Sequence, residues 1–96
     1  MSQNTAQIVQ EYMRANVTEK YGDENFAGLK VCAKTGTAEV GGDKRPNAML
    51  AGFVSDGEYP LAFVVCVEDA GYGATVCIPI ASQVLEACKA AMDGAQ

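Results

Sequence analysis

The sequence predicts an α+β fold, in which a three-stranded antiparallel meander is flanked by an N-terminal and a C-terminal helix. Three observations support this prediction. Apolar residues recur at helical spacing near both ends, the middle carries three short runs rich in apolar and β-branched residues, and an Asp-Gly step joins the last two runs. At 96 residues the chain is long enough for one small domain, so residues 1–96 are predicted to form a single unit.

The first helix is predicted over residues 2–16. One of its faces is expected to be buried, because its apolar residues follow the i, i+3, i+4 spacing of a helix. These residues are Ile8, Val9, Tyr12 and Met13. The opening Ser-Gln-Asn spells an S-x-N motif, but a serine ahead of a helix is expected to cap free N–H groups instead.

The three strands are predicted over residues 29–35, 47–55 and 60–68. A polar connection over residues 19–25 leads into the first strand, and a loop with Gly-Gly-Asp turn chemistry over residues 37–46 follows it. The Ser-Asp-Gly-Glu sequence between the second and third strands is a hairpin turn signal.

The second helix is predicted over residues 75–92, after a glycine-rich break at residues 70–73. Pro79 is expected in or near the first turn of this helix, where a missing N–H does least harm. The helix is expected to pack on the sheet.

The third strand carries an unusual pattern. Residues 61–67 are apolar on both faces, which is typical of a central strand, whereas the third strand of a simple meander lies at an edge. Either a second copy of the chain pairs along residues 60–68, or the chain is part of a larger sheet.

Composition excludes several classes of function. The 12 acidic and 7 basic residues give a net charge of −5, and the basic residues are scattered, so no nucleic-acid partner is predicted. The absence of histidine excludes Ser-His-Asp and Cys-His catalysis within this chain. No cofactor or metal ion is predicted. No membrane segment is predicted either, because the longest apolar run is far shorter than the roughly 20 residues that span a bilayer. No secretory signal is expected ahead of the first helix.

The cysteines are predicted to be buried, unpaired thiols, because none forms a C-x-x-C pair and each sits among small apolar residues. They are Cys32, Cys66, Cys77 and Cys88.

The sharpest chemical signal is Lys34-Thr35-Gly36-Thr37, at the end of the first predicted strand. Taken alone, these four residues favour the plainer interpretation of a strand that ends in a turn with a solvated lysine. Their setting distinguishes the two interpretations, because a glycine-rich loop, an apolar hairpin and an amphipathic helix follow in that order.

This order of motifs resembles the C-terminal end of the transpeptidase domain of penicillin-binding proteins, in particular the class B type. The resemblance covers nearly the whole chain and is densest over residues 31–54. The matching text is Tyr12-Met13-Arg14, residues 31–39, residues 47–54, and Ile78-Pro79-Ile80-Ala81 at the start of the last helix.

The resemblance implies roles for the K-T-G-T residues as one wall of an acyl-transfer cleft. Lys34 would place a cation beside the serine of an S-x-N motif and near the substrate carboxylate. Thr35 and Thr37 would offer hydroxyls to that carboxylate, and Gly36 would leave room for the substrate backbone. The Thr37 N–H would be one of two oxyanion-hole donors. The partner of the parent protein would be a peptidoglycan stem peptide or a β-lactam.

The nucleophile of that family is missing from the chain. The family uses the serine of an S-x-x-K motif, but none of Ser2, Ser55 and Ser82 has a lysine three residues later. The chain is therefore interpreted as a fragment of a larger transpeptidase-like sheet that is inactive alone. The resemblance implies an extracytoplasmic, membrane-anchored parent in a bacterium, although no targeting signal is expected in the chain itself.

Two other functions remain open at this point. One is a noncatalytic interaction module that dimerises through its third strand, over residues 60–68. The other, less favoured, is a degenerate P-loop nucleotide binder, because residues 28–35 follow the Walker A pattern with Ala33 in place of its second glycine. A true P-loop runs directly into a helix, whereas Gly36, Gly41 and Gly42 disfavour a helix after this segment.

Overall fold

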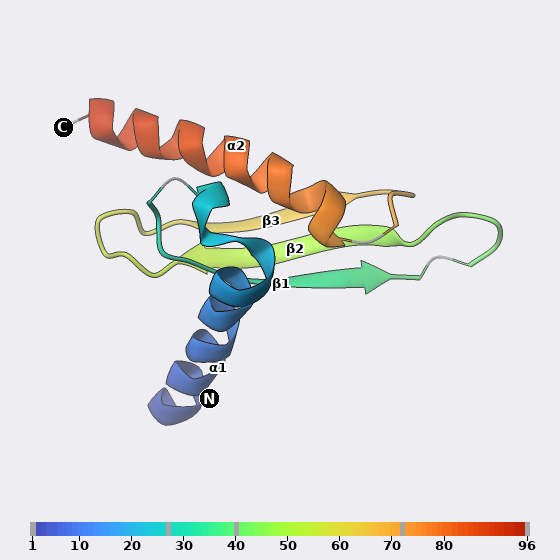
Figure 1. Ribbon diagram of the computed structural model, residues 1–96, viewed down its shortest axis with the longest axis horizontal. Helices are drawn as coiled ribbons and strands as arrows, with labels where there is room; N and C mark the ends of the chain where they lie inside the picture. Colours follow the sequence, from blue (N-terminus) through green and yellow to red (C-terminus); the bar gives the residue numbers. More distant parts are fainter. Residues whose placement is uncertain (1, 27, 40, 72, 96) are drawn as a thin grey trace.

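The computed structural model describes residues 2–26, 28–39, 41–71 and 73–95. Three antiparallel strands lie between two helices in the predicted order, with the sheet order β1-β2-β3 (Figure 1). The predicted α+β meander with flanking helices is therefore confirmed. The elements are α1 (Gln3–Asn16), the π-helical turn η1 (Val17–Tyr21), the 3-10 turn η2 (Asp23–Phe26), β1 (Val31–Ala38), β2 (Asn47–Val54), β3 (Ala62–Val67) and α2 (Gly73–Gly94).

The register assigns side chains to two faces of the sheet. Val31 pairs with Val54, Thr37 pairs with Ala48, and Ala48 pairs in turn with Val67. Because side chains alternate along a strand, the odd residues of β1 and β3 share one face with the even residues of β2. That face holds most of the buried residues of the sheet, including Leu50 at 0% exposure, whereas Cys32 is buried on the other face.

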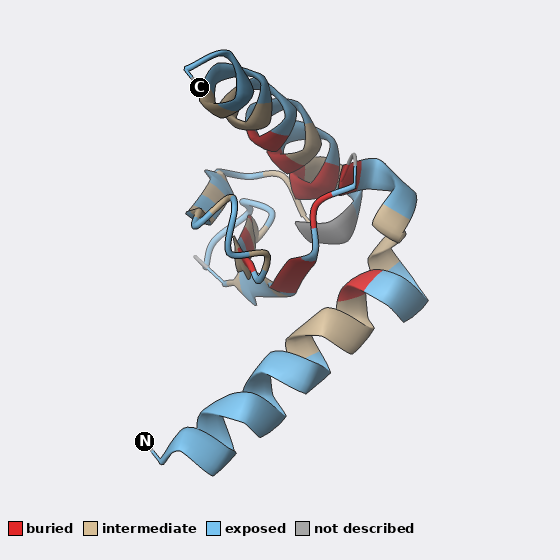
Figure 2. Cartoon of the chain, turned by 90° about the vertical axis from the view of Figure 1, so that its left-hand side faces the viewer, coloured by how far each residue is buried: buried red, intermediate tan, exposed pale blue. Residues whose placement is uncertain are grey.

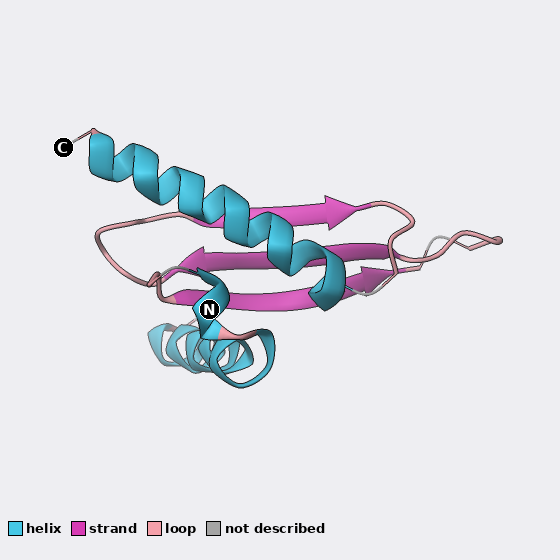
Figure 3. Cartoon of the chain, turned by 45° about the horizontal axis from the view of Figure 1, so that its top comes forward, coloured by secondary structure: helices cyan, strands magenta, loops and turns pink. Residues whose placement is uncertain are grey.

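Helix α2 lies across this buried face of the sheet (Figure 3). Its inward residues, Cys77, Ile78, Ala81 and Leu85, are buried in the same core cluster as the apolar residues of β1 and β2. The predicted packing of the C-terminal helix on the sheet is confirmed. Packing of this apolar stripe against the strands, rather than helix propensity, supplies most of the stability of α2.

Pro79 lies deeper in α2 than predicted. The helix begins at Gly73, so Pro79 is its seventh residue rather than part of its first turn. The ring is tolerated because Pro79 lies on the exposed side of the helix, so that the lost backbone bond faces solvent rather than the core.

The prediction of a buried face on α1 is wrong. No residue of α1 is buried, and Ile8, Val9 and Tyr12 are 43%, 41% and 71% exposed. Figure 2 shows the helix projecting from the body of the protein, with only its last turns near the sheet. The apolar spacing therefore formed a helix that faces the sheet only near its last turns, where Met13 is half-buried. The predicted Ser2 cap is confirmed, since the Ser2 hydroxyl accepts the Thr5 N–H at 3.1 Å.

Several boundaries also differ from prediction. The polar connection folds into η1 and η2, because local turns satisfy its backbone groups. Strand β1 continues through Thr37 to Ala38, which pair with β2 instead of opening the predicted loop. Val40 in the predicted loop over residues 37–46 and Tyr72 in the predicted break over residues 70–73 lie outside the described residues.

The second sheet face and the β3 edge are open. Strand β3 is an edge of the described sheet, and its Val64 is 69% exposed. Burial of the cysteines is confirmed for Cys32 and Cys77, whereas Cys88 is only half-buried. The prediction is wrong for Cys66, which is exposed on the open face. All four cysteines are free thiols. Within the described ranges, neither helix is long and apolar enough to cross a membrane.

Candidate active-site wall

The K-T-G-T sequence occupies the second half of β1, which is an edge strand. Lys34, Gly36 and Thr37 are exposed and Thr35 is half-buried. The four residues therefore lie together on an accessible strand edge. Strand pairing with Leu50, Met49 and Ala48 of β2 holds the backbone of this edge straight.

The backbone groups of β1 alternate between β2 and the open edge. The Lys30 carbonyl accepts the Ser55 N–H at 2.8 Å, on the β2 side. In contrast, the Val31 carbonyl and the Thr35 N–H bond to side chains outside the sheet. Because the pattern repeats every two residues, the Thr37 N–H and C=O are also directed to the open edge. No hydrogen bond joins Thr37 to a side chain among the described residues.

Side chains from α1 and η1 cover the first part of this edge, and we call Arg14, Asn16 and Tyr21 the edge latch. An Arg14 Nη1 donates to the Val31 carbonyl at 2.8 Å, and Asn16 Nδ2 donates to the Ala33 carbonyl at 3.0 Å. The Tyr21 oxygen accepts the Thr35 N–H at 3.1 Å. The latch residues thus bond to outward backbone groups of residues 31, 33 and 35, and none of them bonds to Thr37.

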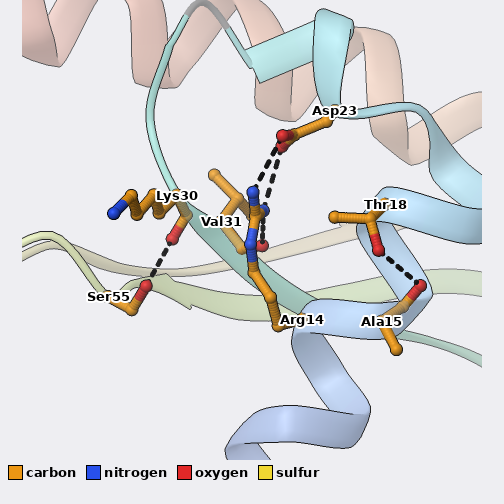
Figure 4. Close-up of polar contacts among 7 residues, drawn as sticks. All are labelled: Arg14, Ala15, Thr18, Asp23, Lys30, Val31 and Ser55. Atoms are coloured by element: carbon orange, nitrogen blue, oxygen red, sulfur yellow. Dashed lines mark hydrogen bonds and ion pairs between the residues drawn. The ribbon is translucent and has the colours of Figure 1, made fainter.

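The guanidinium of Arg14 also anchors the latch to η2. Figure 4 shows it between the Val31 carbonyl and the Asp23 carboxylate. The two Asp23 oxygens accept bonds of 2.9 and 2.8 Å, a bidentate geometry that fixes the plane of the guanidinium. The end of α1 is therefore held to both β1 and the turn that follows η1.

The side chains of the motif divide between the two faces of the sheet. Lys34 and Gly36 belong to the open face, whereas Thr35 and Thr37 alternate to the face of α2. The Lys34 ammonium bends to the edge and donates to the Thr35 carbonyl at 2.8 Å. A cation, a hydroxyl and an outward N–H are thereby gathered along three residues of one edge. Such a row suits an anionic ligand.

The sequence prediction missed Tyr21. Its hydroxyl lies 3.2 Å from the Thr35 hydroxyl in addition to accepting the Thr35 N–H. Nothing in the sequence pattern signals this contact, because it depends on the π-helical turn that carries Tyr21 back toward β1. Single π-turns of this kind are frequent at functional sites.

None of the three serines lies at the K-T-G-T edge. The Ser2 hydroxyl caps α1, Ser82 donates to the Asn25 carbonyl, and Ser55 donates to the Lys30 carbonyl at 3.0 Å. Ser55 thus lies at the opposite end of β1 from Thr37, about 23 Å away at the usual strand rise over seven residues. The buried thiols offer no substitute nucleophile, because burial raises the pKa of both Cys32 and Cys77 and favours the neutral form.

The described residues hold no group of three or more metal-ligating side chains.

Comparison with known protein families gives a match over most of the chain. Residues 1–86 match the family described as the penicillin-binding protein transpeptidase domain. No curated protein and no solved structure gave a significant match. The match includes α1, the edge latch, the whole sheet and α2 as far as Glu86.

Proposed function

Since the chain belongs to the penicillin-binding protein transpeptidase family, we propose that it is the C-terminal part of a peptidoglycan D,D-transpeptidase and forms one wall of its acyl-transfer cleft. The observation that carries this proposal is the accessible K-T-G-T edge, on which the Thr37 N–H points away from the sheet beyond the last latch residue. In this proposal the parent works outside the cytoplasmic membrane of a bacterium.

The reaction would divide its groups between this wall and the rest of the parent. A serine hydroxyl from an S-x-x-K motif elsewhere attacks the carbonyl carbon of a D-Ala-D-Ala end or of a β-lactam, and the carbonyl electron pair moves onto oxygen. The Thr37 N–H stabilises that oxyanion, while its collapse expels the amine, which takes up a proton. Lys34 and the hydroxyls of Thr35 and Thr37 hold the substrate carboxylate. Gly36 leaves the approach of the substrate backbone open.

The chain alone should not form an acyl-enzyme. Intact-mass analysis after exposure to a penicillin is expected to show no adduct, because the wall lacks a nucleophile beside Lys34. A stoichiometric adduct on the isolated chain would contradict the assignment of the nucleophile to another part of the parent protein.

The role of the Thr37 N–H can be tested in a complete transpeptidase domain that contains this segment. Thr37→Pro removes the N–H, and an outward position on an edge strand tolerates proline. The acylation rate should fall by about 10²–10³-fold, as expected for the loss of one oxyanion donor. Thr37→Val, which keeps the N–H and removes the hydroxyl, is the matched control and should lose much less. Equal rates in Thr37→Pro and the unmodified domain would remove the oxyanion role.

A noncatalytic dimerisation module is the second candidate. The Val54 N–H donates to the Leu61 carbonyl at 2.8 Å, so the odd residues of this segment bond toward β2. The backbone groups of Ala62, Val64 and Cys66 are then directed away from the sheet. Beside them an apolar groove of about 300 Å³ runs between β3 and α2, with Ile80 and Val84 on its helix side.

This second candidate has a direct test in the isolated chain. Sedimentation equilibrium should show dimers that Val64→Lys converts to monomers, because a charge at the centre of the edge opposes strand pairing. A strictly monomeric chain at high concentration would exclude it.

The structure does not support the nucleotide-binding alternative. The segment over residues 28–35 runs into β1, which continues to Ala38, where a P-loop requires a helix N-terminus for the phosphate. ATP with magnesium should therefore leave the melting temperature of the chain unchanged.

A further inference from the structure

The Tyr21 hydroxyl makes two contacts with one residue of the K-T-G-T edge. It accepts the Thr35 N–H at 3.1 Å and lies 3.2 Å from the Thr35 hydroxyl oxygen. Among the three latch residues, only Tyr21 touches a side chain of the motif; Arg14 and Asn16 bond to backbone carbonyls of β1.

The position of Tyr21 is fixed by its surroundings. Its ring is half-buried and packs against the core cluster. Its backbone carbonyl accepts Asn25 Nδ2 at 2.8 Å, and the following Gly22 closes the π-turn by donating to the Val17 carbonyl at 2.9 Å. Gly22 has φ +89°, a left-handed conformation that residues with a Cβ rarely adopt, so this turn depends on glycine. The closed π-turn and the packed ring thus hold the phenol oxygen of Tyr21 next to Thr35.

Counting hydrogens sets the direction of the bond between the two hydroxyls. The Tyr21 oxygen carries one hydrogen, and one of its lone pairs is occupied by the Thr35 N–H. If the Tyr21 hydrogen goes to the Thr35 oxygen, the Thr35 hydrogen is left for a group outside the protein. A carboxylate at the edge selects this arrangement, because a bond from a neutral donor to a charged acceptor is stronger than one between two neutral hydroxyls.

We infer that Tyr21 is a positioning residue for carboxylate recognition, which aims the Thr35 hydroxyl hydrogen at the carboxylate of the D-Ala-D-Ala end or β-lactam. The inference rests on the proposed function. Lys34 supports it, because its ammonium lies at the Thr35 carbonyl, on the same edge as the hydroxyl. In this relay Tyr21 donates to Thr35 and Thr35 donates to the carboxylate, and each bond polarises the next.

Phenylalanine at position 21 removes the relay and keeps the ring. In a complete transpeptidase domain that contains this segment, Tyr21→Phe should raise the half-saturation concentration for penicillin acylation roughly fivefold, about the effect of one neutral hydrogen bond. The limiting acylation rate should stay unchanged, because the carboxylate is bound equally in the ground state and the transition state. Tyr12→Phe is the matched control, since Tyr12 is 71% exposed on α1 and should change neither constant.

A double-mutant cycle with Thr35→Val tests whether Tyr21 acts through Thr35. In the Thr35→Val background, Tyr21→Phe should cause no further rise in the half-saturation concentration. Additive effects, a fall in the limiting rate alone, or no effect of Tyr21→Phe would each overturn the inference, because a purely structural role would displace the Thr37 N–H and slow the reaction. Melting curves confirm that each variant is folded.

Lys34→Gln separates this inference from the proposed function. If Lys34→Gln leaves acylation intact, the K-T-G-T wall itself is misassigned. If Lys34→Gln abolishes acylation while Tyr21→Phe behaves as the unmodified domain, the wall stands and only the role of Tyr21 fails.

Discussion

Two glycines in adjacent strands differ in the space that their surroundings leave for a side chain. A Cβ added at Gly52 in β2 would collide with the backbone carbonyl of Cys32 and would lie 2.7 Å from the Phe63 ring. A Cβ added at Gly36 in β1 would lie 3.8 Å from the Met49 Cβ, an ordinary van der Waals distance. Gly52 is therefore required by packing, whereas nothing in the packing requires Gly36.

Gly52→Ala should lower the free energy of unfolding by about 1–3 kcal/mol, because the carbonyl that blocks the new methyl group belongs to a paired strand and cannot move away cheaply. Gly36→Ala is the matched control and should change it by less than about 0.5 kcal/mol. Urea unfolding monitored by circular dichroism measures both. Equal stability of the two variants would show that β1 and β2 separate more easily than their register implies.

A cluster of three side chains ties the C-terminal end of α2 to the β2–β3 turn. The Tyr59 hydroxyl donates to Asp93 at 2.6 Å, and the Lys89 ammonium contacts the same carboxylate at 3.0 Å. The bond from Tyr59, followed by that from Lys89, lowers the pKa of Asp93. The bond to Asp93 likewise raises the pKa of Tyr59, and Asp93 raises the pKa of Lys89.

These directions fix the pH range in which the cluster stabilises the fold. A lowered carboxyl pKa contributes stability above the ordinary Asp value near pH 4 and loses it as the pH falls through the folded-state pKa. Asp93→Asn should lower the melting temperature by about 1–3 °C at pH 7, and the difference from the unmodified chain should vanish near pH 2. Glu86→Gln, an exposed position on the same helix, is the control. A difference that persists at pH 2 would mean that packing, not charge, links these elements.

Some elements were predictable from sequence because the apolar residues that define their pattern are the ones buried in the fold. Strand β2 forms within the predicted residues 47–55, and α2 buries its apolar stripe on that sheet. The apolar spacing of α1 predicted a helix correctly but could not tell whether a surface lies opposite Ile8 and Val9. The K-T-G-T residues were recognisable in sequence, whereas the contact of Tyr21 with Thr35 was not, since it depends on how a π-turn closes.

The molecule as a whole has a thin core that lies mostly between α2 and one face of the sheet. Helix α2 covers one face of the sheet, and the other face leaves Met49, Ala51 and Phe53 partly or wholly exposed. A chain of this length has a free energy of unfolding on the order of 5–14 kcal/mol at the usual value per residue. Each side chain of the single buried layer therefore contributes a large share of the total.

Neighbouring positions on α2 should report this dependence. Leu85→Ala should lower the free energy of unfolding by about 2–5 kcal/mol, because Leu85 is 2% exposed within the core. Val84→Ala, at 49% exposure on the adjacent position, should lower it by less than about 1 kcal/mol. Denaturant unfolding of both variants measures the difference. Similar losses at the two positions would indicate that α2 is not seated on the sheet as described.

The attachment of α1 has a mechanical consequence. Its last turn grips β1 through Arg14 and Asn16, while the turns before it contain no buried residue. The helix is thus attached to the strand that carries Lys34 only at its C-terminal end, so it can act on that strand as a lever. A load applied to the N-terminal end of α1 is transmitted as a pull on two carbonyls of that strand.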